Sequence, residues 1–122
     1  MEIRLVGAPL QIGAGQLGCE MGPSAYRVAG LARALEELGH KVVDTGNVMP
    51  TPLRDFAHPN PAVHHLAETV AWTEALTEAA YRESAGAVPI FLGGDHAISA
   101  GTVAGMARRV AESGRPFFVL WL

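Results

Sequence analysis

Short apolar runs alternate along the chain with longer segments in which apolar residues recur every three or four positions. The apolar runs, rich in branched and aromatic residues, occupy 3–6, 40–48, 88–94 and 115–122. Strands separated by helical segments of this length are typical of parallel sheets. The pattern therefore predicts an α/β fold with four strands.

Three helices are expected between these strands, over 23–38, 60–85 and 95–114, with Gly39 and Gly86 ending the first two. The apolar positions predicted to share a face are Val28, Leu31, Leu35 and Leu38 in the first, Trp72, Leu76, Ala79 and Ala80 in the second, and Val103, Met106, Ala107 and Val110 in the third. Asn60 and Pro61 have the residue types of a helix cap and first turn. The segment 49–61 holds four of the eight prolines, so we expect a surface excursion there.

Composition narrows the class of protein. The chain has 122 residues, of which 49% are hydrophobic and 17% charged, and a net charge of −3, which indicates a single soluble globular unit. A mildly acidic chain without a basic patch is repelled by phosphate backbones, so we expect no nucleic-acid partner. No leader and no apolar run of membrane-spanning length is visible, and Cys19 is the single cysteine. We expect a cytoplasmic protein that does not enter a membrane.

The last residues of the chain are unusually apolar. Phe117 to Leu122 run to the end of the sequence without a turn or cap. In open parallel sheets, functional groups gather in the loops beyond the carboxyl ends of strands. We therefore expect this chain to be a fragment that stops where the next functional loop begins.

The Gly-x-Gly-x-x-Gly spacing of dinucleotide-binding loops occurs at Gly13, Gly15 and Gly18. In such loops the strand leads directly into the first glycine, whereas six residues separate Val6 from Gly13. Glu20 would also bring a carboxylate to the place where a pyrophosphate approaches, which is unfavourable. Asp44, at the end of the second predicted strand, is the one residue placed to bind a ribose. Nucleotide binding is therefore the least favoured alternative, and we assign no cofactor-binding residue.

The segment FLGGDHAIS carries a stronger chemical signal. Two glycines, Asp95 and His96 stand at the end of a predicted strand, which places them at the carboxyl edge of the sheet. His96 has the residue type of a metal ligand, and Asp95 is placed to cap the next helix or to orient a neighbour. By local chemistry alone, a helix cap and a histidine held by a backbone carbonyl explain the pair at least as well, because divalent ions need several further ligands. The remaining histidines are assigned no site: His40, His58, His64 and His65.

Taken together, several segments resemble the arginase-type ureohydrolases. These segments are GAP from Gly7, GCEMGPSAYRVAGL from Gly18, DTGN from Asp44 and LGGDH from Leu92, in the same order along the whole chain. The chain looks like the N-terminal part, less than half, of one such catalytic domain. The last residues resemble the strand that immediately precedes an Asp-Ala-His-x-Asp metal motif in that family. The GPSAYRVAGL segment is more similar to arginases than to agmatinases.

The resemblance implies a three-layer α/β/α fold, incomplete at the C-terminus, over residues 1–122. It implies a hydrolase of arginine metabolism, as in the urea cycle, that converts L-arginine to ornithine and urea. In the implied reaction, a hydroxide that bridges two manganese ions attacks the guanidinium carbon. It also implies a homo-oligomer, commonly a trimer or hexamer. His96 would be a manganese ligand and Asp95 a supporting residue beside it, and no catalytic residue is assigned.

One residue departs from the family pattern. Ala97 stands where the family usually has a serine, which removes a hydroxyl near the metal but no ligand. Three readings stay open: part of a dimanganese guanidinohydrolase, whether for arginine or an agmatinase-like substrate; a non-catalytic truncated remnant; and a nucleotide-binding domain. The fragment alone is expected to be inactive.

Overall fold

A parallel sheet of three strands forms the centre of the molecule. The computed structural model describes residues 1–54 and 58–121, so the predictions that fall on 55–57 and on Leu122 lie outside the described residues. The strands are β1 (Glu2–Ala8), β2 (Lys41–Asn47) and β3 (Val88–Gly93), in the order β2-β1-β3. In register, Leu5 of β1 lies opposite Asp44 of β2 and Ile90 of β3. The first three predicted strands are confirmed.

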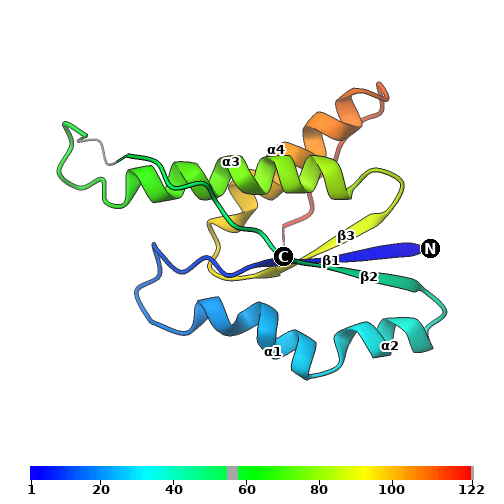
Figure 1. Cartoon of the computed structure of the whole chain (residues 1–122). Coiled ribbons are helices and arrows are strands. Elements are labelled where there is room, and N and C mark those ends of the chain that lie inside the picture. Colours follow the sequence, from blue (N-terminus) through cyan, green and yellow to red (C-terminus); the bar gives the residue numbers. More distant parts are fainter. Residues whose placement is uncertain (55–57, 122) are drawn as a thin grey trace.

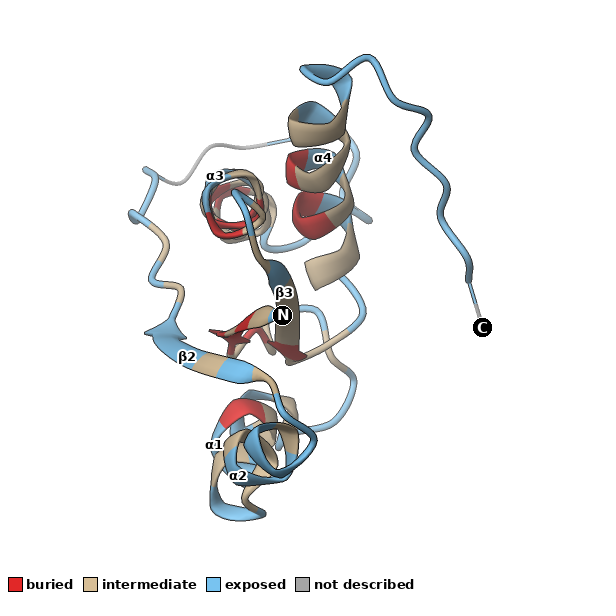
Figure 2. Cartoon of the chain, turned by 90° about the vertical axis from the view of Figure 1, so that its right-hand side faces the viewer, coloured by how far each residue is buried: buried red, intermediate tan, exposed pale blue. Residues whose placement is uncertain are grey.

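Helices cover both faces of this sheet (Figure 1). A short 3-10 helix, η1 (Cys19–Met21), leads into α1 (Gly22–Val28) and α2 (Leu31–Glu37), which lie on one face. On the other face lie α3 (Leu66–Glu83) and α4 (Ile98–Ala111), packed against each other (Figure 2). The predicted three-layer α/β/α arrangement is confirmed. No helix within residues 1–54 and 58–121 is long and apolar enough to span a bilayer.

The core on the α2 side explains why the apolar runs become strands. Ile3, Leu5 and Leu92 form a buried cluster, and Leu31 and Leu35 of α2 pack against it. Alternate residues of a strand point to opposite faces, so the two-residue spacing of Ile3 and Leu5 brings both to this cluster. Burial of apolar side chains of this size is the main favourable contribution to folding.

The first predicted helix is wrong in one respect, because it is two helices. Gly30 adopts φ 85°, a left-handed conformation in which an α-helix cannot continue. The break turns α2 relative to α1, so the predicted common face is lost. Val28 and Leu38 are 89% and 73% exposed, whereas Leu31 and Leu35 face the core.

The second helix starts later than its sequence predicts. The Oδ1 atom of Asn60 accepts a hydrogen bond from the N–H of Ala62 at 2.9 Å, which closes a local turn instead of capping a helix. Helix α3 begins only at Leu66, after His65 with φ 53°. The predicted apolar face holds for the buried side chains Leu76, Ala79 and Ala80, and Trp72 is half-buried.

Two glycines of α4 set its packing against α3. A Cβ atom on Gly101 would lie 2.6 Å from Leu76 Cβ, and one on Gly105 would lie 2.7 Å from Ala80 Cβ. Both glycines are buried, so the backbones of the two helices are in close contact. The face with the glycines, and not the one with larger side chains, meets α3. The apolar face predicted for α4 is therefore only half-buried; it consists of Val103, Met106, Ala107 and Val110.

The predicted fourth strand is wrong for the residues that are described. Segment 115–121 forms no strand and runs apart from the sheet (Figure 2). Phe118 and Leu120 are 84% and 81% exposed. A strand is stabilised by pairing its backbone N–H and C=O groups with a neighbour, and within the described residues this segment has no such pairing.

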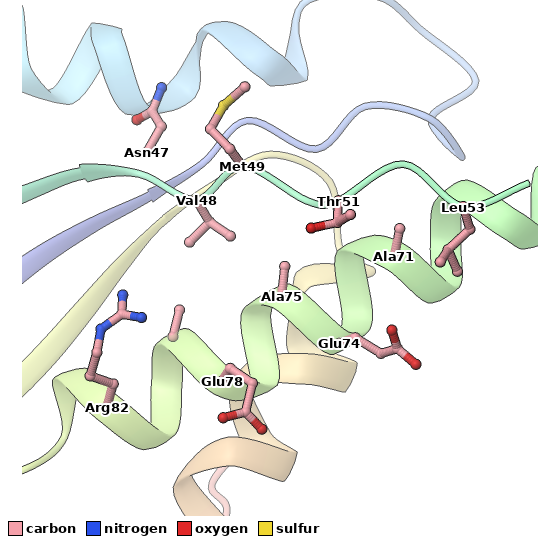
Figure 3. Close-up of a pocket in the computed structure, with 11 residues that line it drawn as sticks. Asn47, Val48, Met49, Thr51, Leu53, Ala71, Glu74, Ala75, Glu78 and Arg82 are labelled. Atoms are coloured by element: carbon pink, nitrogen blue, oxygen red, sulfur yellow. The ribbon is translucent and has the colours of Figure 1, made fainter.

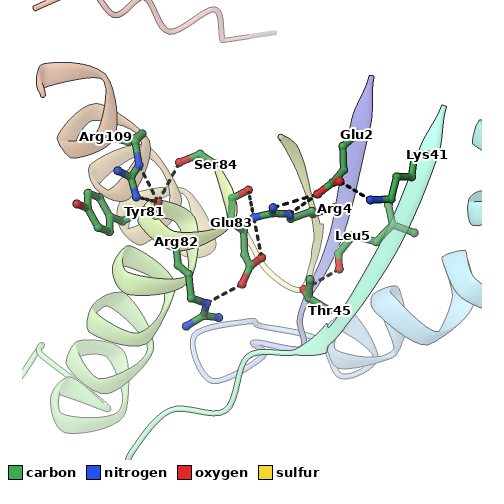
Figure 4. Close-up of polar contacts among 10 residues, drawn as sticks. All are labelled: Glu2, Arg4, Leu5, Lys41, Thr45, Tyr81, Arg82, Glu83, Ser84 and Arg109. Atoms are coloured by element: carbon green, nitrogen blue, oxygen red, sulfur yellow. Dashed lines mark hydrogen bonds and ion pairs between the residues drawn. The ribbon is translucent and has the colours of Figure 1, made fainter. Parts of the chain in front are cut away.

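Ion pairs hold the opposite, amino-terminal edge of the sheet (Figure 4). Glu2 accepts hydrogen bonds from Lys41, at 2.8 Å, and from Arg4, at 3.0 Å, and these bonds hold the pKa of Glu2 below its usual value. Arg4 also contacts the buried carboxylate of Glu83 at the end of α3, with 3.5 Å between Nη1 and Oε2. These ion pairs connect β1 with β2 and with α3, and their role is structural.

Candidate functional site

Two loops lie side by side at the carboxyl edge of the sheet. The glycine-rich loop 9–18 follows β1, and the turn 94–97 follows β3. Asp95 donates its N–H to the carbonyl oxygen of Leu10 at 2.8 Å, and the Gly94 N–H points to the Cys19 carbonyl at 3.4 Å. The glycine-rich loop and the Asp95–His96 pair therefore lie at one place in the fold.

The close approach of these loops requires glycine at two positions. Gly94 has φ 52°, and a Cβ atom there would lie 2.7 Å from the carbonyl oxygen of Leu10. A Cβ atom on Gly22 would collide with the carbonyl oxygen of Gly93. A larger residue at either position would push α1 or the glycine-rich loop away from the end of β3.

Asp95 shapes the turn that carries His96. Its Oδ1 atom accepts a hydrogen bond from the N–H of Ala97 at 2.8 Å, and its carbonyl oxygen lies 3.4 Å from the N–H of Ile98. The carboxylate thus closes the turn before α4, whose own N-cap is Ala97. The other oxygen, Oδ2, is buried and has no hydrogen-bond partner among the described residues.

His96 is exposed at the end of this turn. Its ring stacks on Trp121, with 4.9 Å between centroids and 10° between planes. The Ser99 hydroxyl donates to the His96 carbonyl at 2.5 Å and lies 3.5 Å from Nδ1. Among the described residues no backbone carbonyl accepts a hydrogen bond from this ring, so the alternative of a histidine held by a backbone carbonyl is not observed.

The side chains available as ligands determine whether this site can bind a metal ion. Imidazole suits transition-metal ions, and His96 presents one at an exposed sheet edge. Within residues 1–54 and 58–121, however, no three side chains of His, Cys, Asp or Glu come close enough together to bind a metal ion. The residues present therefore fit one ligand position and not a complete metal centre.

The other histidines lie elsewhere. His64 and His65 are exposed just before α3, and His58 accepts a hydrogen bond from the Asn60 N–H at 3.1 Å. His40 lies in the turn before β2, and its buried Nδ1 has no partner among the described residues. None of the four lies in the turn that carries His96.

Asp44 is engaged by an arginine that sequence reasoning missed. Arg27 of α1 donates to both carboxylate oxygens of Asp44, with Nε 2.7 Å from Oδ2 and Nη2 2.8 Å from Oδ1, and its Nη1 donates to Asn47 at 2.6 Å. These bonds hold the pKa of Asp44 below its usual value and raise that of Arg27. Both Asp44 oxygens already accept hydrogen bonds within the fold, so this carboxylate has a structural role that explains it without a ribose.

A hollow lies between the segment 47–53 and α3 (Figure 3). Its charged lining consists of Glu74, Glu78 and Arg82, and Glu78 already pairs with Arg108 of α4 at 2.5 Å. Neither Asp95 nor His96 lines it. The hollow is therefore separate from the turn that carries His96 and contains no imidazole.

Comparisons with known proteins place these features in a family. A family model described as the arginase family matches residues 1–122. The arginase of Brucella melitensis is 57% identical over 122 residues, which are 100% of this chain and 40% of that protein. The arginase of Agrobacterium fabrum is 50% identical over 120 residues, covering 98% of this chain and 37% of that protein.

Solved structures give the same result for the fold. A crystal structure of an arginase from Bacillus cereus matches with a TM-score of 0.75 at 33% identity, over 88% of this chain and 35% of that chain. The present chain thus spans about 40% of the length of the Brucella relative.

Proposed function

Because the chain belongs to the arginase family over all of its 122 residues, we propose that it is the N-terminal part of an enzyme that hydrolyses L-arginine to L-ornithine and urea. The observation that carries the proposal is the 57% identity to the Brucella melitensis arginase over the whole chain. The position of His96 at the carboxyl edge of a parallel sheet supports it, because active sites of such sheets gather there.

The proposal needs a metal centre that this chain supplies only in part. His96 contributes one imidazole, and we infer that the other ligands come from the part of the relatives that this chain does not span. A pair of manganese ions, when bound, would activate a water molecule near neutral pH and stabilise the charge that develops on the guanidinium group. This activation is needed because a resonance-stabilised guanidinium is a poor electrophile.

The residues of this chain then act by placing the imidazole. Helix α4 and the turn 94–97 fix the backbone of His96, and Ser99 donates to its carbonyl oxygen. Asp95 supports the turn through Ala97. We propose that the intact protein is cytoplasmic and assembles as a homo-oligomer, a trimer or hexamer, and that the 122-residue chain alone is inactive.

A chimera tests this function. Residues 1–122 replace the matching segment of the Brucella melitensis arginase, and urea release is measured with L-arginine and with agmatine, beside the unaltered Brucella enzyme. We expect urea from L-arginine in clear preference to agmatine. A folded chimera that prefers agmatine would favour the agmatinase-like alternative, and one that releases urea from neither would favour the non-catalytic remnant.

A further inference from the structure

The glycine-rich loop is a closed unit of the structure. The Oε1 atom of Gln11 accepts a hydrogen bond from the Gly18 N–H at 2.5 Å, which joins the two ends of the segment. Inside it, the Ala14 N–H donates to the Gln11 carbonyl at 3.0 Å. These bonds close the segment 11–18 on itself.

Asp95 makes hydrogen bonds to both that unit and the turn of His96. The N–H of Asp95 donates to the Leu10 carbonyl at 2.8 Å, and its Oδ1 accepts from the Ala97 N–H at 2.8 Å. One bond holds the loop and the other holds the turn. The backbone bond to Leu10 depends on the turn geometry that the carboxylate stabilises.

The second carboxylate oxygen faces the loop. Oδ2 of Asp95 is buried without a partner among the described residues, and a Cβ atom on Gly13 would lie 3.8 Å from it. A buried polar atom without a partner is unfavourable and is rare in folded proteins. Its position indicates that the carboxylate lies at the contact between the turn and the loop.

We propose that Asp95 is a positioning residue that couples the glycine-rich loop to the imidazole of His96. The loop has the glycine spacing of a nucleotide-binding loop, but in this proposal it helps to orient the imidazole of His96. The coupling itself is a property of the metal-free chain, and its effect on metal affinity rests on the proposed function.

Hydrogen exchange in the metal-free 122-residue chain tests the coupling. In Asp95→Ala the turn loses its side-chain acceptor, and we expect exchange of the amides in 10–18 to rise about fivefold, the change that follows from losing one capping bond. Asp95→Asn keeps an acceptor for Ala97 and should stay close to the parent. Asn60→Ala, which removes a similar turn bond distant from the site, is the matched control. Unchanged exchange in 10–18 for Asp95→Ala would overturn the proposal.

Manganese affinity of the chimera with the Brucella arginase tests the consequence for His96. Loss of a residue that orients a ligand typically weakens metal binding about tenfold or more, so we expect this loss in Asp95→Ala and its rescue in Asp95→Asn. An Asp95→Asn chimera as weak as Asp95→Ala would show that the charge acts on the metal directly and would overturn the positioning role. If the parent chimera binds no manganese, the proposed function fails, while the exchange experiment still decides the coupling.

Discussion

The guanidinium of Arg27 and the carboxylate of Asp44 meet side by side, with 2.7 Å between Nε and Oδ2 and 2.8 Å between Nη2 and Oδ1. This pair joins the end of α1 to β2 across one face of the sheet. Asp44 also accepts a hydrogen bond from the Gly46 N–H at 2.9 Å. The carboxylate therefore fixes both its own strand and the helix that covers it.

The first prediction concerns the pH dependence of this pair. The pKa of Asp44 is lower in the folded chain than in the unfolded one, so its stabilising effect is present above the unfolded value of about 3.9 and is lost as the pH falls through the folded value. Asp44→Asn should lower the free energy of unfolding at pH 7 by about 1 kcal/mol, because the pair is partly exposed. Urea unfolding at pH 7 and in acid measures both effects.

A matched variant exists for this experiment. Arg33 and Glu37 form a highly exposed pair at 3.5 Å, and Glu37→Gln should leave the unfolding free energy almost unchanged. Equal effects of Glu37→Gln and Asp44→Asn would show that the contact of Arg27 with Asp44 has no special weight.

The second prediction concerns the contact of α3 and α4. A Cβ atom on Gly105 would lie 2.9 Å from the backbone nitrogen of Tyr81, so Gly105→Ala forces the helices apart. Overpacking of this kind costs about 1–3 kcal/mol, and the better helix propensity of alanine offsets about 1 kcal/mol of it. Thermal unfolding should show a lower Tm for this variant. Gly15→Ala, where nothing lies within 4 Å, is the control, and an unchanged Tm in Gly105→Ala would contradict the close packing.

The strands were predictable from sequence because each is a local apolar run, as in Val88–Gly93. The break at Gly30 was not, because a glycine inside a helical pattern is tolerated and its φ depends on how the flanking helices pack. The start of α3 was missed for a related reason: Asn60 makes its bond within a turn, and the same residue type serves both turns and helix caps.

For the candidate site, the sequence suggests residues but not the contacts between them. The end of a buried strand marks Asp95 and His96 as candidates, since parallel strands bring their carboxyl ends to one edge. The bond from Asp95 to Leu10 joins positions far apart in the chain, and no local pattern specifies it. Of the strand predicted over 115–122, the described residues 115–121 form none, because apolar residues mark a segment able to pair without specifying a neighbour to pair with.

The third prediction concerns association of the chain. Phe118, Leu120 and Trp121 are between 61% and 84% exposed, and exposed apolar segments of extended backbone invite pairing between molecules. The 122-residue chain should therefore elute above its monomer mass in size-exclusion chromatography with light scattering. Replacing Phe118 and Leu120 by lysine should shift it toward the monomer. A parent chain that is monomeric with a sharp, high melting transition would contradict this prediction.

The fourth prediction concerns the activity of the chain by itself. Two divalent ions need several converging ligands, and among the described residues no three side chains of His, Cys, Asp or Glu converge; at the sheet edge the candidates are His96 and, less favoured, Asp95. Calorimetric titration of the 122-residue chain with manganese should show weak binding at most, and an assay with L-arginine should detect no urea. Tight binding of two ions, or urea from this chain, would show that the site is misplaced.

We propose that His96 is the manganese ligand that this chain contributes, and manganese titration of the Brucella chimera tests this assignment most directly. We predict that His96→Ala weakens one of two manganese sites much more than the other and lowers kcat for L-arginine, because one ion loses an imidazole. His64→Ala, an exposed histidine before α3, should match the parent chimera in both measurements. Two unaltered manganese affinities in His96→Ala, or an equal loss in His64→Ala, would contradict the account.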